Sequence, residues 1–192
     1  VKVFDQMRKL QSYTDEGSPG RDWNVATGMV IEGKAGFQIM GDWAKGEFTA
    51  AGKVPGVDYY CAATPSNNGY LYNVDSFIFY KSSDPDKQAG QQLLAKLMMG
   101  KNFQKVFNLY KGSIPARLDV SMDEFDKCAK TSNADIKTAG AKGGLVPSFA
   151  HGMAQGNTMK AALQDIITEH FNSDMSSVDA ANALADSVLA NM

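Results

Sequence analysis

The stretch from Ala35 to Glu47 places the strongest constraint on how this chain can fold. Residues 37–40 are mostly apolar and predict a short strand, which Gly41 then interrupts. Asp42 follows as a candidate cap for a helix whose apolar spacing continues from there. Such a turn places Trp43 at the carboxyl end of a strand, where open α/β sheets bind ligands. Trp43 is therefore either a core residue or a flat apolar binding surface, and the local sequence leaves both readings open.

The rest of the chain mixes amphipathic helices with a few short strands. Apolar residues at helical spacing predict helices over residues 1–13, 83–99, 103–110, 159–170 and 178–188. Residues 24–32 also look helical, and a capping box predicts a helix over 121–139. Alternation, β-branched residues and aromatic residues predict strands over 37–40, 58–63 and 70–80, and composition predicts a loop over 64–69. This mixture indicates an α/β protein, but three or four strands are few for a complete doubly wound sheet. We therefore expect this chain to be part of a larger fold.

Several local signals make these expectations specific. Asp84 followed by Pro85 is typical of a helix start, and Ser121 with Glu124 has the spacing of a capping box. Asp75 interrupts the apolar strand 70–80 and needs a partner, because burying a bare carboxylate is costly. The helix that follows Pro85 is expected to bury one apolar stripe, made of Ala89, Leu93, Leu94, Leu97 and Met98.

Composition and charge exclude some classes of protein. The chain has 192 residues, 44% of them hydrophobic and 21% charged, and a net charge of −2, as in ordinary globular proteins. Without a basic patch, we expect no nucleic-acid partner. No apolar run approaches the roughly 20 residues of a membrane-spanning helix. The chain begins with Val1 rather than Met, which we expect of a processed or excerpted piece of a longer protein.

The sequence carries few residues that point to catalysis or metal binding. It lacks the nucleophile elbow, the zinc-protease helix motif, the phosphate-binding loop and the dinucleotide-binding glycine pattern. Of the two histidines, His170 lies on an apolar helix stripe and is expected to be structural. His151 lies in a loop, where it contacts either a ligand or the local backbone. Cys61 and Cys128 form either one disulfide or two small buried apolar side chains, depending on the compartment.

Four segments, read together and in order, resemble a known family. They are Gly41-Asp-Trp43, Asp75-Ser-Phe77, Lys111-Gly-Ser-Ile-Pro-Ala-Arg-Leu-Asp119 and Ser148-Phe-Ala-His-Gly152. Over its whole length the chain resembles the C-terminal half of the periplasmic glucose-binding proteins of bacterial ABC transporters, most closely the pseudomonad members. These belong to the wider class of extracellular solute-binding proteins.

The resemblance implies a fold and a division into domains. The family has the bilobal periplasmic-binding-protein fold, two α/β lobes joined by a hinge, of which this chain would supply about the C-terminal half. Residues 1–74 would form the first part of the C-terminal lobe, and residues 118–192 its second part. Residues 75–117 would hold the interlobe crossings and helices of the N-terminal lobe. The missing N-terminal half of the same protein would then be a partner of this chain.

The resemblance also implies a site and an activity. Trp43 would stack on a sugar ring, and Asp75 would accept hydrogen bonds from sugar hydroxyl groups. Lys111 would donate hydrogen bonds to hydroxyl oxygens, and His151 would also contact the sugar. The protein would trap glucose or a close monosaccharide in the interlobe cleft and deliver it to the ABC permease in the inner membrane. No catalysis, no cofactor and no metal are implied. The periplasm is oxidising, which permits a Cys61–Cys128 disulfide.

Two alternatives remain beside the transport receptor. One is a fragment of a carbohydrate-active enzyme, such as a glycosidase, which needs two carboxylates flanking one bond. Asp42 and Asp75 can be nominated for that role, although no feature of the sequence sets their separation. The other is a chemosensory sugar-binding module on the same scaffold.

Overall fold

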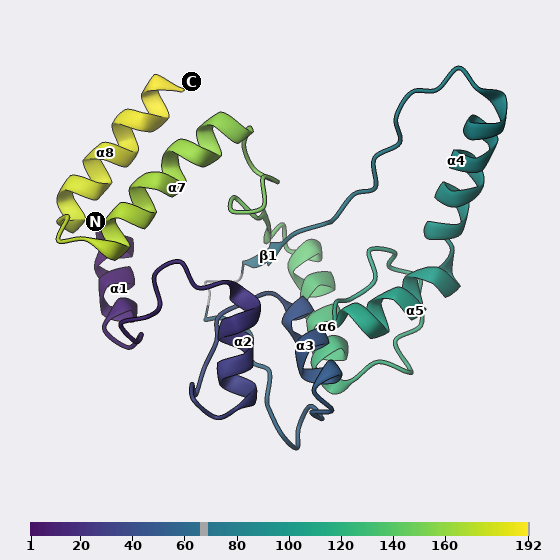
Figure 1. Cartoon of the computed structure of the whole chain (residues 1–192), viewed down its shortest axis with the longest axis horizontal. Helices are drawn as coiled ribbons and strands as arrows, with labels where there is room; N and C mark the ends of the chain where they lie inside the picture. Colours follow the sequence, from purple (N-terminus) through teal and green to yellow (C-terminus); the bar gives the residue numbers. More distant parts are fainter. Residues whose placement is uncertain (66–68, 192) are drawn as a thin grey trace. The chain divides into compact units, whose positions relative to one another are not determined.

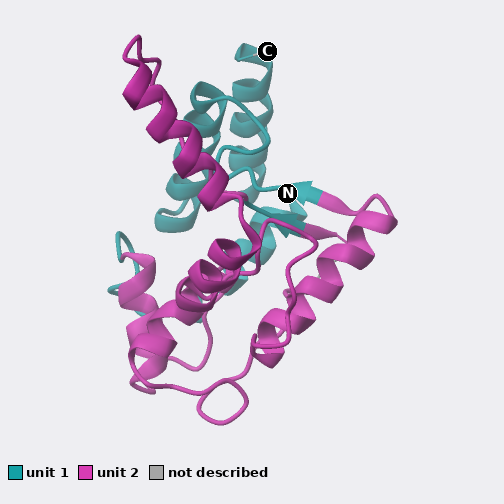
Figure 2. Ribbon diagram, turned by 90° about the vertical axis from the view of Figure 1, so that its right-hand side faces the viewer, with its two compact units in different colours: residues 1–21, 71–73, 146–192 teal, residues 22–70, 74–145 magenta. Residues whose placement is uncertain are grey.

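A computed structural model describes residues 1–65 and 69–191 of the chain. These residues form two compact units (Figure 1; Figure 2). Unit 1 contains Val1–Arg21, Leu71–Asn73 and Val146–Met192, and unit 2 contains Asp22–Tyr70 and Val74–Leu145. The boundaries of the units differ from the lobe boundaries that the resemblance implies, so the lobes at 1–74, 75–117 and 118–192 stay a prediction.

Unit 1 is built from three helices, α1 (Lys2–Gln11), α7 (Asn157–Asn172) and α8 (Ser177–Ala190). The last two pack against each other, and α1 contacts both. Phe4 and His170 lie in this core, where their rings meet edge to face with centroids 4.7 Å apart. His170 is fully buried, as predicted for a structural histidine. Its Nε2 lies 3.5 Å from Ser177 Oγ, while its Nδ1 has no hydrogen-bond partner among the described residues.

The helices of unit 1 are also tied through backbone carbonyls. The Arg8 guanidinium donates to the carbonyl oxygens of His170 at 2.5 Å and Met175 at 2.9 Å. Gln11 Nε2 donates to the carbonyl oxygen of Phe171 at 2.6 Å. The last carbonyl groups of a helix lack intrahelical hydrogen-bond partners. At the end of α7, Arg8 and Gln11 donate hydrogen bonds to such carbonyl oxygens.

Unit 2 contains the remaining helices. They are α2 (Trp23–Ile31), the 3₁₀ turn η1 (Asp42–Ala44), α3 (Lys45–Ala50), α4 (Pro85–Met98), α5 (Lys101–Lys111) and α6 (Lys127–Ala141). α3 contacts α2, α5 and η1. Its buried face carries Phe48, which stacks on Tyr59 with ring centroids 4.2 Å apart. This short helix therefore lies at the centre of the unit.

A partly buried ion pair and a disulfide join α6 to the segments around α3. Lys45 is buried, and its Nζ donates to Asp126 Oδ2 at 2.7 Å. Asp126 also caps α6 by accepting from the amide of Ala129 at 2.9 Å. Burial opposes ionisation of Asp126, but the Lys45 ammonium and the Ala129 amide hold its pKa below the usual value. Cys61 and Cys128 are joined by a disulfide, with Cα atoms 5.7 Å apart.

The strands are fewer than predicted. The sheet of the described residues has two strands, β1 (Tyr70–Tyr72) and β2 (Leu145–Pro147). The predicted strands at 37–40 and 58–63 are wrong, and 70–80 is a strand only at its beginning. Strands need neighbours for their backbone groups, and among the described residues these segments form no ladder beyond β1. Their apolar side chains are exposed, Phe37 to 96% and Ile78 to 78%. The predicted loop 64–69 falls partly outside the described residues.

The helix predictions fared better, with two corrections. α4 begins as predicted, because Asp84 accepts from the amides of Asp86 and Lys87. Its expected buried stripe (Ala89, Leu93, Leu94, Leu97 and Met98) is wrong, since no residue of α4 is buried and Leu93 is 70% exposed. The Ser121–Glu124 capping box is also wrong: Ser121 bonds Asp123, and α6 begins six residues later at Asp126–Lys127.

Candidate functional site

The corner that carries Trp43 (residues 41–44) is joined by Asp42 to the turn after α5 (residues 112–114), which is distant in the sequence. Gly41 is extended, and η1 and α3 follow it without a break. Asp42 does not cap this helix, so that prediction is wrong. Its Oδ2 instead accepts from the amide of Ile114 at 3.1 Å. Burial raises the pKa of Asp42, and the Ile114 hydrogen bond opposes that rise.

Two glycines let the same corner and turn approach each other backbone to backbone. A Cβ at Gly46 would lie 2.9 Å from the carbonyl oxygen of Lys111. A Cβ at Gly112 would lie 2.6 Å from the amide nitrogen of Gly46. Gly112 also ends α5 with a φ of +88°, a left-handed conformation that glycine adopts at little cost. Lys111 is therefore held at the last turn of α5, directly against the start of α3.

Asp75 and Lys111 form an ion pair, although 36 positions separate them in the chain. The Lys111 side chain is 29% exposed and that of Asp75 is 64% exposed. Lys111 Nζ also lies 5.7 Å from the ring centroid of Phe107, one turn earlier on α5. The pair combines a group that only accepts hydrogen bonds with one that only donates them, and both remain within reach of solvent.

Trp43 is half-buried rather than a member of the buried core. Its six-membered ring lies against the backbone of Gly41. A Cβ built at Gly41 would lie 2.1, 2.3 and 2.5 Å from Cζ3, Cη2 and Cε3 of the indole. The structure therefore seats the indole on the corner itself, where part of its surface stays accessible.

His151 belongs to unit 1, whereas Trp43, Asp75 and Lys111 belong to unit 2. It is exposed and follows β2. Its Nδ1 lies 2.7 Å from the hydroxyl oxygen of Ser148, which is only 2% exposed. The structure thus brings three of the four predicted segments together within unit 2. The loop that carries His151 has its own local anchor in unit 1.

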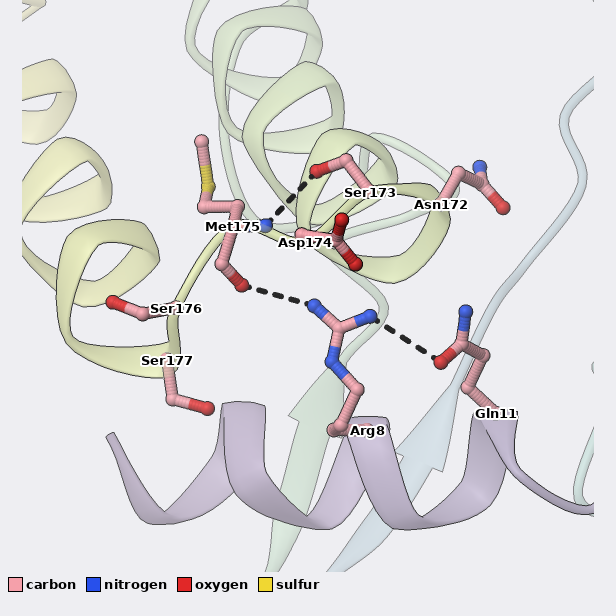
Figure 3. A pocket seen from close by; sticks show the side chains of 8 residues that line it. All are labelled: Arg8, Gln11, Asn172, Ser173, Asp174, Met175, Ser176 and Ser177. Atoms are coloured by element: carbon pink, nitrogen blue, oxygen red, sulfur yellow. Dashed lines mark hydrogen bonds between the residues drawn. The ribbon is translucent and has the colours of Figure 1, made fainter.

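Two hollows in the described surface contain none of the predicted site residues. One, of about 580 Å³, lies within unit 1 between α1 and the α7–α8 turn and is lined by polar groups (Figure 3). Arg8 and Gln11 enter it from α1, but both already bond carbonyl oxygens there. The other, of about 500 Å³, lies between α4 and α5 and is mostly apolar, with Leu93, Leu97 and Phe103 in its wall.

Some residues that shape the site escaped the sequence analysis. Gly46 and Gly112 were not singled out, although a glycine after the last turn of a predicted helix is a recognised stop signal. The Lys45–Asp126 pair had no local signal, since its members are 81 positions apart. No group of three or more His, Cys, Asp or Glu residues that could hold a metal occurs in the described parts of the chain. Likewise, no helix described here is long and apolar enough to cross a membrane.

Comparison with known proteins gives consistent matches. Residues 1–165 match the family model described as bacterial extracellular solute-binding protein. A relative from Brucella suis, named "Probable sugar-binding periplasmic protein", is 47% identical over 97% of this chain and 44% of its own length. A protein of the same name from Rhizobium meliloti is 45% identical, over 97% of this chain and 45% of its length. An ABC transporter extracellular-binding protein from Pyrococcus horikoshii is 34% identical, over 88% of this chain and 37% of its length.

These matches establish three points. The chain spans less than half the length of the curated relatives it matches. It is a periplasmic protein, as its closely similar relatives are named. Because the family model covers most of the chain, the chain belongs to the bacterial extracellular solute-binding protein family.

Proposed function

We propose that this chain is part of a sugar-binding receptor of an ABC importer, and that its ligand is glucose or a close monosaccharide. The observation that carries this proposal is the Asp75–Lys111 pair, held against the corner that bears Trp43. Sugar hydroxyls need both donors and acceptors, and the pair offers one of each. An indole supplies the flat apolar surface that covers the C–H face of a sugar ring.

The names of the relatives support a sugar as the ligand and an ABC permease in the inner membrane as the partner. They leave the identity of the sugar to experiment. In the proposed mechanism the receptor closes two lobes over the sugar and presents the closed form to the permease. The ligand is delivered unchanged, without a cofactor. His151 would contribute a further contact to a hydroxyl group.

The lobes belong to the same proposal. Residues 1–74 and 118–192 would build the C-terminal lobe, and residues 75–117 would add helices to the N-terminal lobe. The rest of that lobe would come from polypeptide corresponding to the part of the relatives outside this match. The exposed apolar residues of α4, such as Leu93 and Leu97, fit this arrangement, since large apolar patches usually mark a covered surface.

Calorimetric titration with glucose, mannose and xylose tests the proposal, with this chain paired with the polypeptide that would supply the rest of the N-terminal lobe. We expect heat of binding with glucose, and Lys111→Met and Asp75→Asn should each weaken binding about 10- to 100-fold. That range corresponds to a charge-assisted hydrogen bond of about 1.5–3 kcal/mol. Lys34→Met is the matched control, because Lys34 forms a comparable exposed ion pair with Glu32, 2.6 Å long, outside the site.

The result that would contradict the proposal is equal affinity of the wild type and the Lys111→Met variant for every sugar, or no binding of any sugar. Recovery of the sugar after long incubation separates the receptor from the alternative of a carbohydrate-active enzyme. Unchanged glucose is expected of a receptor. A hydrolysed or transferred product from an oligosaccharide would favour the enzyme.

A further inference from the structure

The contact between Gly41 and Trp43 has a geometry that identifies which part of the indole is covered. Three consecutive atoms of the six-membered ring lie at nearly equal distances, 2.1, 2.3 and 2.5 Å, from the position of a Gly41 Cβ. An approach to the ring edge would leave the outer two atoms much farther away than the middle one. The Cβ position therefore lies over the face of the ring, and the backbone of Gly41 covers that face.

The backbone conformation of Gly41 does not explain why glycine stands there. Its φ of −68° and ψ of 164° belong to the extended region that any residue adopts. Real Cβ atoms do not approach other heavy atoms to such distances, so any side chain here must displace the indole. The three atoms nearest to that Cβ position all belong to Trp43, so the indole is what a glycine accommodates here.

The backbone around the contact leaves little room for adjustment. Asp42, which separates the two residues, is bonded to the amide of Ile114. Two residues after Trp43, Lys45 is buried and paired with Asp126. Both ends of the η1 turn are therefore anchored to other segments of unit 2, and a displaced ring must change its rotamer rather than carry the backbone with it.

We propose that Gly41 is a positioning residue for Trp43: it seats one face of the indole and so restricts a monosaccharide to stacking on the opposite face. This inference rests on the proposed sugar-binding function. It adds to that function the stacking face and the residue that determines it. Apolar C–H groups of a sugar pack on an aromatic face at van der Waals distance, so a tilted ring loses contact over its whole area.

The test uses the full chain in a Trp23→Phe background, which leaves Trp43 as its single tryptophan. The hydrogen bonds of Thr27 and Gln38 to Trp23 go to its backbone carbonyl oxygen, which phenylalanine retains. In this background Gly41→Ala should alter the near-ultraviolet circular dichroism and fluorescence of Trp43 without any ligand. It should also weaken glucose binding at least 10-fold. Gly36→Ala is the matched control, because a Cβ at Gly36 would meet no atom within 4 Å, and it should change neither signal.

A double-variant comparison separates positioning from a general structural role. Gly41→Ala should shift the unfolding midpoint when Trp43 is present and leave it unchanged in a Trp43→Ala background, where the obstructing ring is gone. An equal shift in both backgrounds, or unchanged spectra in Gly41→Ala, would overturn the inference. Nuclear Overhauser contacts between bound glucose and the Gly41 Hα protons would overturn the assignment of the face.

The proposed function and this inference fail in different ways. If the wild type binds no sugar, the proposed function and the assignment of a stacking face both fall. The altered tryptophan spectra of Gly41→Ala would still support the positioning contact, since they are measured without sugar. If the wild type binds glucose and Gly41→Ala binds equally well, only the inference about Gly41 falls.

Discussion

The Cys61–Cys128 disulfide gives a prediction whose size follows from its place in the chain. It closes a loop with a sequence separation of 67 residues, which includes both Asp75 and Lys111. A cross-link stabilises mainly by restricting the unfolded chain, and a loop of this length corresponds to about 4 kcal/mol at 25 °C in the chain-entropy relation. Replacing the pair by Cys61→Ser with Cys128→Ala should therefore lower the free energy of unfolding by about that amount.

Urea unfolding followed by far-ultraviolet circular dichroism measures this loss. With a slope of about 2 kcal/mol per molar urea, the midpoint should fall by about 2 M. Reductant should lower the midpoint of the wild type to that of the double variant and leave the variant unchanged. Glucose affinity should change little under conditions where the variant is folded, because Lys111 is held by the Gly46–Gly112 contact rather than by the disulfide. A midpoint shift equivalent to less than about 1 kcal/mol would refute the reasoning from loop closure.

Two further predictions concern the turn at Gly112 and the buried His170. Gly112→Ala should destabilise the chain by about 2–4 kcal/mol in urea unfolding, because a left-handed residue with a Cβ costs about 1 kcal/mol and the overpacking against Gly46 adds about 1–3 kcal/mol. Gly143→Ala is its control: it also has a positive φ but would meet no atom within 4 Å, so it should lose only the first contribution. Burial lowers the pKa of His170 below 6.5, and the charge of Arg8 adds to this shift while Asp5 opposes it. The unfolded chain therefore binds more protons than the folded chain below pH 6.5. The free energy of unfolding should fall as the pH drops from 6.5 towards the folded-state pKa, by at most about 1.4 kcal/mol per pH unit. His170→Gln should remove this pH dependence, and an unchanged slope would contradict its assignment to His170.

Helices were predictable from this sequence because their signals are local. Local signals predicted a helix in the place of every helix of eight or more residues in the described chain, and Asp84 with Pro85 identified one start. The start of α6 was predicted at Ser121 instead of Asp126, because both residues are of a type that caps helices. Ser121 with Glu124 matches one pattern, but Asp126 caps the helix and also pairs with the buried Lys45. That pairing is not local, so the sequence around Ser121 could not reveal it.

Strands were poorly predicted for a related reason. Residues 37–40 and 73–80 have the composition of strands, but a strand exists only where a neighbouring backbone accepts and donates its hydrogen bonds. Local sequence patterns also could not predict that the site residues come together. Trp43, Asp75 and Lys111 were linked only through the resemblance, whereas the structure links their segments by the Asp42–Ile114 bond, the glycine contacts and the ion pair.

Asp75 shows how far physical reasoning from a single residue can reach. A carboxylate in a segment expected to be a buried strand predicted a partner; the structure supplies Lys111, although Asp75 lies in no strand and its side chain is 64% exposed. The pair could serve stability or ligand binding, and the two roles differ in magnitude. Because both side chains are partly exposed, the ion pair contributes at most about 1 kcal/mol to stability. Hydrogen bonds from the same two charges to sugar hydroxyls would each contribute about 1.5–3 kcal/mol to binding. Lys111→Met therefore distinguishes the roles: a loss of affinity with little change in the unfolding midpoint identifies a binding residue, and the reverse identifies a structural one.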